Sequence, residues 1–468
     1  MANRSLDVGV KHSGIFIHSE NESAPFVVGT LWLDENRGVI AEIPYISSAS
    51  DQFETPTRWF RVRKPPANLV FRTEDLEISL FGCTFSRAMS GSHLNIGGLR
   101  AREAVLHERI GEIDDPLTIS VLGSQMDGLA DWTRLSSVSW GSEWIQDEHG
   151  GRRRLNYTIE RQDGLTWYQG EARMTLTSHW GPNDDTRSGI HLDDVVVLLS
   201  KFRTPRPVAD HLAEHRKFRD LLSLIYGTGA HFRKHEIRDR GFPFQTLDGK
   251  IHGAENHQVI CAATIQDHYR PESSRNAHNF PILSISDVSS STLSEWAMRY
   301  HDWRRLILPV AGVLRRSGLL VEEIVINTSM SIEAIGQKLG RMPNEQATYG
   351  SGANRPTTAT YYYRTARAVG LDTSPISCPD AELSRALADI YNTIKHPDRG
   401  DFPNPIVTHF AGRIMLLLAR LALMKLLLPD GAAVDRFVKS WTVRRVFEDM
   451  ERNSVTVDAS GRFVVVEP

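Results

Sequence analysis

The segment AELSRALADIYNTIKHPDRG, residues 381–400, carries the side chains that could do chemistry. Its polar residues recur at the spacing of one helix face, opposite an apolar stripe. They are Arg385, Asp389, Asn392 and His396. A proline follows His396 and disfavours helical geometry at the residue before it, so we expect the helix to end at His396. The carbonyl end of the helix dipole favours an imidazolium at that position.

A histidine that titrates near neutrality can take the proton of an RNA 2′-hydroxyl, or give one to a 5′-oxygen leaving group. Lys395 and Arg399 flank His396 and could stabilise the charge on an attacked phosphate. This chemistry needs no metal and no cofactor, and we expect neither. A merely solvated helix face would show the same residue types and is the commoner case for such a pattern. The surrounding elements must therefore decide between the two interpretations.

The chain up to about residue 205 is predicted to form strands, because short β-branched or alternating runs are separated by turn-prone segments. Many short strands at this spacing are typical of a sandwich or barrel. A helix is expected at about 208–226, followed by two further strands, the second over 280–288. The Ser-rich segment 287–291 then marks a boundary.

After that boundary the hydrophobic period becomes helical. Thr292 and Glu295 match a capping box at the head of the first helix. The expected helices cover residues 292–318, 320–340, 356–370, 379–396, 405–428 and 433–450. We therefore predict an α+β multidomain protein with a β-rich domain over 1–288, an all-α bundle over 289–452 and a terminal β-hairpin over 453–468.

The bulk composition excludes several classes of protein. The net charge of −3 gives no global case for a nucleic-acid coat, and the three cysteines have no metal-binding spacing. The first residues lack the apolar core of a signal peptide, and the longest apolar stretch is interrupted by Arg420 and Lys425. We expect a cytoplasmic protein without a membrane segment. The histidine pairs at 211 and 215, and at 231 and 235, do not belong to an HExxH motif, so no metal site is assigned.

Three segments together resemble a known family. IYNTIKHPDRG and the order of the helices resemble the HEPN superfamily, specifically its ApeA-like branch from bacterial phage defence. VEEIVINTSMSIEAIGQKL resembles the HEPN helix that carries a glutamate, and SGIFIHSENESAPFVVGTLWLDENRGVIAEI resembles the start of the ApeA N-terminal domain. The resemblance implies a β-rich N-terminal domain followed by a helical HEPN domain, as the periodicity also predicts.

Active HEPN ribonucleases carry an arginine, a polar residue, a short spacer and a histidine. Asn392 and His396 match this motif, but Tyr391 stands in the arginine position. A phenol cannot supply the arginine's charge, although it could donate a hydrogen bond. Arg399 is the better substitute, because Arg385 lies about 16 Å from His396 along the helix. Arg385 and Lys395 could instead contact another part of the RNA.

The leading interpretation is an abortive-infection protein with a metal-independent HEPN ribonuclease that cleaves cellular or phage RNA. The resemblance implies that the β-rich half senses a phage component or restrains activity, and that two copies form a homodimer around a shared cleft. A second interpretation is a catalytically inactive HEPN module that dimerises and binds RNA or a phage protein. A third is a carbohydrate- or protein-binding β-sandwich with a helical oligomerisation tail.

Overall fold

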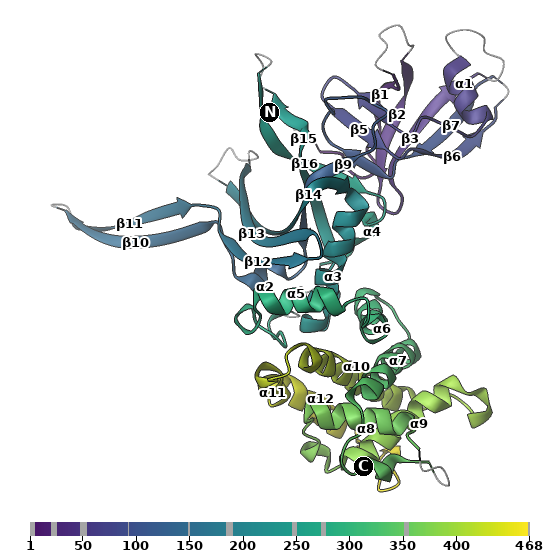
Figure 1. Cartoon of the computed structure of the whole chain (residues 1–468), viewed down its shortest axis with the longest axis vertical. Helices are drawn as coiled ribbons and strands as arrows, with labels where there is room; N and C mark the ends of the chain where they lie inside the picture. Colours follow the sequence, from purple (N-terminus) through teal and green to yellow (C-terminus); the bar gives the residue numbers. More distant parts are fainter. Residues whose placement is uncertain are drawn as a thin grey trace.

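The chain forms a β-rich front half and a helical back half, seen at the top and bottom of Figure 1. The computed structural model describes residues 5–19, 26–46, 54–91, 93–147, 150–183, 191–245, 250–272, 278–350 and 355–466. The front half runs through its last strand at Cys261, and helices dominate from Ile265 to Arg452. The predicted α+β architecture, with strands first and helices second, is confirmed.

The front half is built on one continuous antiparallel sheet, which has fourteen strands among the described residues. Their order across the sheet is β12-β13-β14-β9-β15-β16-β8-β5-β4-β1-β2-β3-β7-β6. The strands are β1 His12–Ile17, β2 Val27–Asp34, β3 Gly38–Tyr45, β4 Leu69–Arg72, β5 Glu77–Phe81, β6 Thr84–Met89, β7 Asn95–Arg100, β8 Glu103–Val105, β9 Thr118–Met126, β12 Asp163–Gln169, β13 Ala172–Asn183, β14 His191–Pro207, β15 Phe232–Gln245 and β16 Ile251–Cys261. Because β9, β14 and β15 come from distant parts of the sequence, this order brings remote side chains onto one face.

A few smaller elements decorate the sheet. The strands β10 (Val138–Asp147) and β11 (Gly150–Ile159) pair only with each other and project as an arm at the left of Figure 1. The helices of this half are α1 Glu54–Arg61, α2 Leu129–Thr133, α3 Val208–Tyr226 and α4 Ile265–His268. The helix predicted over 208–226 is therefore confirmed as α3, which packs on β14 and β9.

The back half consists of helices joined by short connections, ending in a small hairpin. The helices are α5 Ser290–Arg299, α6 Arg304–Arg315, α7 Val321–Leu339, α8 Thr358–Val369, α9 Asp380–Lys395, α10 Pro405–Leu427, α11 Ala432–Val438 and α12 Trp441–Arg452. Single 3-10 turns lie at η3 Ile285–Asp287, η4 Glu345–Thr348, η5 Ser374–Ile376 and η6 Pro397–Arg399. The hairpin predicted around Ser460 and Gly461 is confirmed as β17 Val455–Val457 and β18 Phe463–Val465.

Two predicted helices are each broken in two. The expected helix over 292–318 is α5 and α6, because α5 packs against β12 whereas α6 packs against α7. Its cap is Ser289, whose hydroxyl accepts from the amide of Thr292, and not the predicted Thr292–Glu295 box. The expected helix over 433–450 is α11 and α12, since Ser440 adopts extended backbone between them.

The strand predicted over 280–288 is wrong. Ile282 and Leu283 are both buried, so the segment anchors two consecutive side chains and does not alternate between two faces. The amide of Ile282 donates to the carbonyl of Ile225 at the end of α3, and Ser284 with Asp287 closes a 3-10 turn. This segment therefore packs against the C-terminal end of α3 without forming a strand.

One of the hydrophobic clusters of the chain spans both halves. A single cluster of buried side chains includes Trp167 of β12 and Leu222 of α3 as well as Leu383 of α9 and Leu418 of α10. The Trp296 indole of α5 also donates to the Lys217 carbonyl of α3, at 2.8 Å. The domain boundary that the sequence predicts at 287–291 thus lies within continuous packing.

Within this cluster, Arg420 of α10 forms hydrogen bonds to the end of α3. Its guanidinium donates to the last carbonyls of α3, Leu224 at 2.8 Å and Ile225 at 3.0 Å. Burial lowers the pKa of Arg420 to about 10, which leaves the side chain charged at neutral pH. Gly227 ends α3 with φ +77°, and a Cβ there would lie 2.2 Å from Nη1 of Arg420. Only glycine suits both the backbone and the approach.

Replacing Arg420 by methionine should lower the free energy of unfolding by about 1–3 kcal/mol, because a buried carbonyl loses its donor. Urea denaturation followed by circular dichroism measures the change. The matched control is Arg413→Met on the same helix, whose partly exposed pair with Asp449 should contribute below about 1 kcal/mol. Equal effects of the two substitutions would contradict the role assigned to Arg420.

Candidate active site

The end of α9 matches the prediction from Pro397. The helix stops at Lys395, and His396 leaves it with φ −117° and ψ 108°, the extended geometry that a following proline favours. The amide of His396 still donates to the Asn392 carbonyl at 3.0 Å, so the histidine is held to the last turn. Its side chain is exposed.

Arg399 is positioned beside this face by the turn that follows. The 3-10 turn η6 lets the Arg399 amide donate to the His396 carbonyl at 3.1 Å. The guanidinium then reaches back to Asp389, with 3.8 Å between Nη1 and Oδ1. Asp389, Asn392 and His396 are spaced three and four residues apart on one helix face. The Arg399 guanidinium and the Asp389 carboxylate are thereby in contact, and Asn392 and His396 follow on the same face toward the exposed end of the helix.

Tyr391 lies on the other side of α9. It is 3% exposed and belongs to the core, next in position to the buried Leu387 and Ile390. The Lys395 ammonium lies 5.1 Å from the centre of its ring and covers it. A hydrogen bond to Tyr391 raises the pKa of Lys395, with a smaller contribution from the charge of Glu333. The position expected to hold the phosphate-binding arginine is thus a core position in this chain.

Arg385 is set apart from the other predicted site residues. Its guanidinium donates to the Ala347 carbonyl at 3.1 Å and pairs with Glu382 at 3.7 Å. The backbone of Gly461 also lies against its side chain. These contacts hold α9 against η4 and the terminal hairpin. Arg385 therefore has a structural role, at a distance from His396.

Two acidic neighbours were not singled out from the sequence as site residues. Asp389 was visible on the polar face, but its contact with Arg399 depends on the turn after Pro397. Glu333 comes from α7, where its carboxylate accepts from the Thr358 hydroxyl at 2.9 Å. The segment 321–339 resembles the HEPN helix that carries a glutamate, but no spacing within it points to Lys395.

Three of the four histidines in these pairs, His211, His215 and His235, have rings that are hydrogen-bonded inside the protein. His211 and His215 of α3 bond to Ser200 at 2.8 Å each, and His215 also bonds to Ser124 at 2.6 Å. His235 lies on a strand and bonds to the same Ser124 at 2.7 Å. Burial lowers the pKa of His215 and of His235, so both are neutral. The geometry gives these histidines a structural task between α3 and the sheet.

Comparison with known families identifies the front of the chain. Residues 11–296 match the family described as ApeA N-terminal domain 1. The chain belongs to the ApeA family. ApeA membership indicates a role in anti-phage defence, and the helical back half fits the arrangement that the resemblance implied. No curated protein and no solved structure matched the chain.

The ApeA match ends within α5 and does not cover the rest of the helical back half. In the described part of this ApeA chain, no helix combines the length and apolarity needed to cross a bilayer.

Proposed function

We propose that this ApeA-family chain acts in anti-phage defence as a metal-independent ribonuclease, with its active site at the exposed end of α9. The observations that support it are that Asn392 and the exposed His396 lie one turn apart at the end of α9, and that the Arg399 guanidinium reaches Asp389 on the same helix face. An exposed ion pair contributes at most about 1 kcal/mol, so Arg399 can leave Asp389 for a phosphate at little cost.

The proposed reaction is an intramolecular transesterification. His396 takes the proton of a 2′-hydroxyl, and the 2′-oxygen attacks the adjacent phosphorus. The P–O5′ bond breaks, and the leaving 5′-oxygen gains a proton from the imidazolium of His396 or its counterpart in a second copy. Arg399 stabilises the charge on the phosphoryl oxygens, and Asn392 donates a hydrogen bond. The products carry a 2′,3′-cyclic phosphate and a 5′-hydroxyl.

The test uses the purified full-length chain with total bacterial RNA and with phage RNA in excess EDTA. We expect cleavage to persist, and the new 5′ ends to be labelled by polynucleotide kinase without prior phosphatase treatment. Cleavage that stops in EDTA, or that leaves 5′-phosphates, would contradict this chemistry.

Arg399→Gln should lower the cleavage rate by about 10²–10³-fold, the usual effect of losing one donor to a charge that develops in the transition state. Arg399→Lys should restore part of the rate, because a point charge lacks the guanidinium's fork. Single-turnover rates on a defined RNA measure both. Arg367→Gln, at an exposed position on the neighbouring helix α8, serves as the control and should leave the rate close to wild type.

A non-catalytic HEPN module is the second candidate, and burial of Tyr391 is the observation that favours it. In that case the domain dimerises and binds RNA or a phage protein without cleaving. Electrophoretic mobility shifts on the same RNAs, with no product after long incubation, would support this alternative over the ribonuclease.

We also propose that two copies pair with their α9 ends facing a shared cleft. Phe402, 68% exposed in the connection after His396, is an apolar side chain suited to such a contact. The front half, proposed as a domain over 1–288, would then sense a phage component and restrain the helical domain over 289–452. Sedimentation of the wild type against Phe402→Glu tests the pairing.

A further inference from the structure

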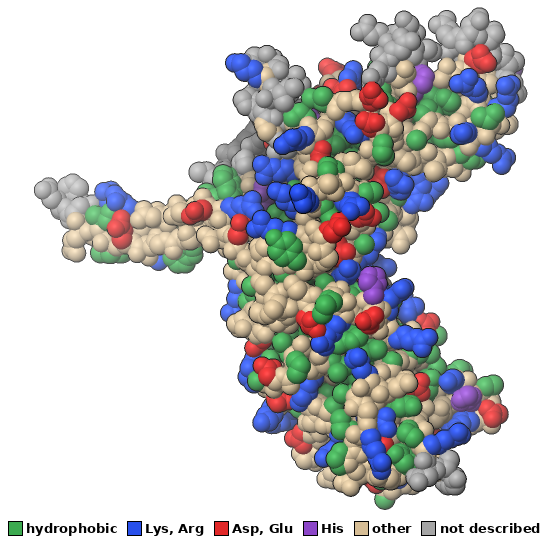
Figure 2. Space-filling model, in the orientation of Figure 1, with side chains coloured by type: hydrophobic (Ala, Val, Ile, Leu, Met, Phe, Trp, Pro, Cys, Tyr) green, Lys and Arg blue, Asp and Glu red, His purple; other side chains and the backbone are tan. Residues whose placement is uncertain are grey.

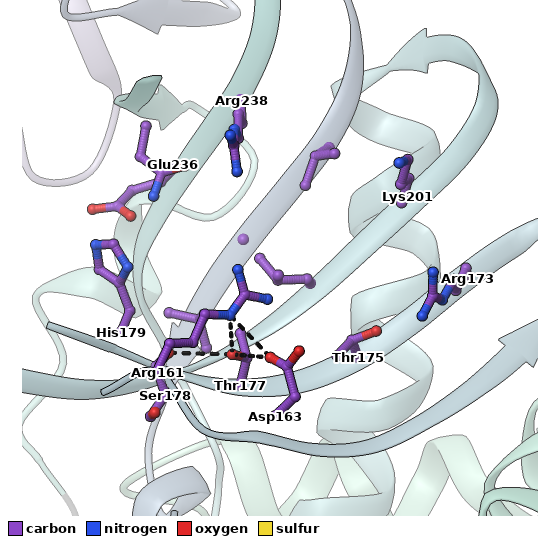
Figure 3. A pocket seen from close by; sticks show the side chains of 15 residues that line it. Arg161, Asp163, Arg173, Thr175, Thr177, Ser178, His179, Lys201, Glu236 and Arg238 are labelled. Carbon is purple, nitrogen blue, oxygen red and sulfur yellow. Dashed lines mark hydrogen bonds and ion pairs between the residues drawn. The ribbon is translucent and has the colours of Figure 1, made fainter. Parts of the chain in front are cut away.

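The face of the sheet opposite α3 holds a pocket of about 320 Å³, which is near the lower limit for small-molecule sites. Its walls come from β9, β12–β16 and the loop before β12 (Figure 3). Four cationic side chains line it, namely Arg161, Arg173, Lys201 and Arg238. Lysines and arginines gather over the central strands of the front half in Figure 2.

The two carboxylates that line this pocket are already engaged. Asp163 accepts from Nε of Arg161 at 2.9 Å and from the Thr177 hydroxyl at 2.6 Å. These bonds, with Thr177 first, lower the pKa of Asp163, so it stays ionised. Glu236 pairs with Lys234 at 2.8 Å. Among the described residues, no ion pair is formed by Arg173 or by Lys201, and the pocket keeps an excess of positive charge.

The strand register places three of these cations in one row across the sheet. Arg173 of β13 lies directly opposite Lys201 of β14, and Lys201 is paired in turn with Val121 of β9. Arg238 of β15 is the partner of Val121 on the other side. Like charges directly opposite each other destabilise a sheet. The opposed Arg173 and Lys201 therefore cost the fold free energy, and an anion bound between them offsets that cost.

The rest of the pocket offers an apolar floor and a second polar end. Val121, Val197 and Leu199 line the floor, and Gly123 contributes no side chain to it. A Cβ at Gly123 would lie 3.1 Å from Cδ2 of Leu199, so the glycine keeps the floor low. His179 and Glu236 lie side by side across the pocket from Arg173 and Lys201 (Figure 3).

We propose that this pocket binds a small phosphate-bearing ligand of mononucleotide size. The phosphate is held by Arg173 and Lys201, with Arg238 at the edge, because charge-assisted bonds to phosphate are strong. The ring and sugar lie over the apolar floor, and His179 and Glu236 supply hydrogen bonds to the polar edge. The small volume of the pocket, about 320 Å³, favours a free nucleotide over a continuous RNA strand.

Isothermal titration of the full chain tests the proposal, using the four ribonucleoside 5′-monophosphates, the unphosphorylated nucleosides, inorganic phosphate and a ten-nucleotide RNA. At least one monophosphate should bind, at least tenfold tighter than its nucleoside, and more weakly as salt rises. Arg173→Gln and Lys201→Gln should each weaken binding about tenfold or more. Arg154→Gln on the β10–β11 arm is the matched control and should bind as the wild type does.

A second readout separates ligand binding from a structural role. Removing one of two opposed cations relieves repulsion, so the unliganded Arg173→Gln and Lys201→Gln variants should melt at or above the wild-type temperature. Lower melting temperatures with unchanged affinity would overturn the proposal. So would an absence of binding by all four monophosphates, or binding of the RNA alone. None of these measurements depends on RNA cleavage, so failure here leaves the proposed ribonuclease untouched.

Discussion

Replacing His396 by alanine is expected to lower the rate of RNA cleavage by about 10²–10⁴-fold, the usual contribution of a general acid–base group. In the proposed site His396 is the group that accepts the 2′-hydroxyl proton, since Asn392 does not titrate and Lys395 and Arg399 are cationic at neutral pH. The Asp389 carboxylate lies about two helical turns away and is paired with Arg399. The measurement is a single-turnover rate on a defined RNA in EDTA, with toxicity on expression in bacteria as a second readout.

The control for this prediction is His409→Ala. His409 is an exposed imidazole near the start of α10, on a neighbouring helix of the same bundle. Its loss should leave the rate within a few-fold of wild type. His396 is exposed, so the variant should also keep the wild-type melting temperature, which excludes misfolding as the cause. Wild-type cleavage by His396→Ala would reject the site.

Replacing Glu345 by glutamine is expected to lower the free energy of unfolding by about 3–5 kcal/mol, because it leaves a buried cation without its partner. The Glu345 side chain is 0% exposed, and it accepts two bonds from Arg364, at 2.7 and 2.8 Å. The Tyr349 hydroxyl and the Met342 amide complete its shell, at 2.7 and 2.8 Å. Urea denaturation at pH 7 measures the loss.

The same pair predicts a dependence on pH. The bonds from Arg364 lower the pKa of Glu345 to about 2, from an ordinary value of 4.5. A carboxyl whose folded pKa is depressed contributes stability that is complete above about 4.5 and is lost as the pH falls through about 2. The wild type should therefore lose stability faster than Glu345→Gln over that window. Parallel curves would contradict the assignment.

The double replacement Glu345→Leu with Arg364→Met is the control for charge burial. Apolar residues of similar volume remove both charges, so this variant should recover much of the stability that the single change loses. A double variant less stable than Glu345→Gln would show that the shape of the pair, and not its charge, holds η4 against α8.

The parts of the fold that depend on local pattern could be predicted from the sequence. Pro397 restricts the residue before it, so α9 ends at Lys395 and His396 takes extended geometry, within one residue of the predicted end. The apolar period located α3 and most of the back-half helices. The break between α5 and α6 was missed because it follows from a change of packing partner, and the break between α11 and α12 because Ser440 takes extended backbone. The helical period records neither.

The candidate site was predictable only in part for a similar reason. Asn392 and His396 share a face by spacing alone, whereas the Arg399–Asp389 contact needs the geometry of η6. The burial of Tyr391 could have been predicted from its place beside Ile390 in the apolar stripe. The family motif instead led us to treat position 391 as a phosphate-binding position. The cationic pocket joins Arg173, Lys201 and Arg238 through a strand register that no local pattern specifies.

The core shared by the two halves has a consequence for how signals pass through the chain. Since side chains of β12 and α3 pack in one cluster with those of α9 and α10, we expect this end of the sheet to unfold together with the bundle. Any ligand that binds only the native sheet then stabilises the bundle as well, by about 2.7 kcal/mol at a hundred times its dissociation constant. Thermodynamic linkage of this kind needs no conformational change, because a ligand bound to the sheet raises the free energy of unfolding of the bundle as well.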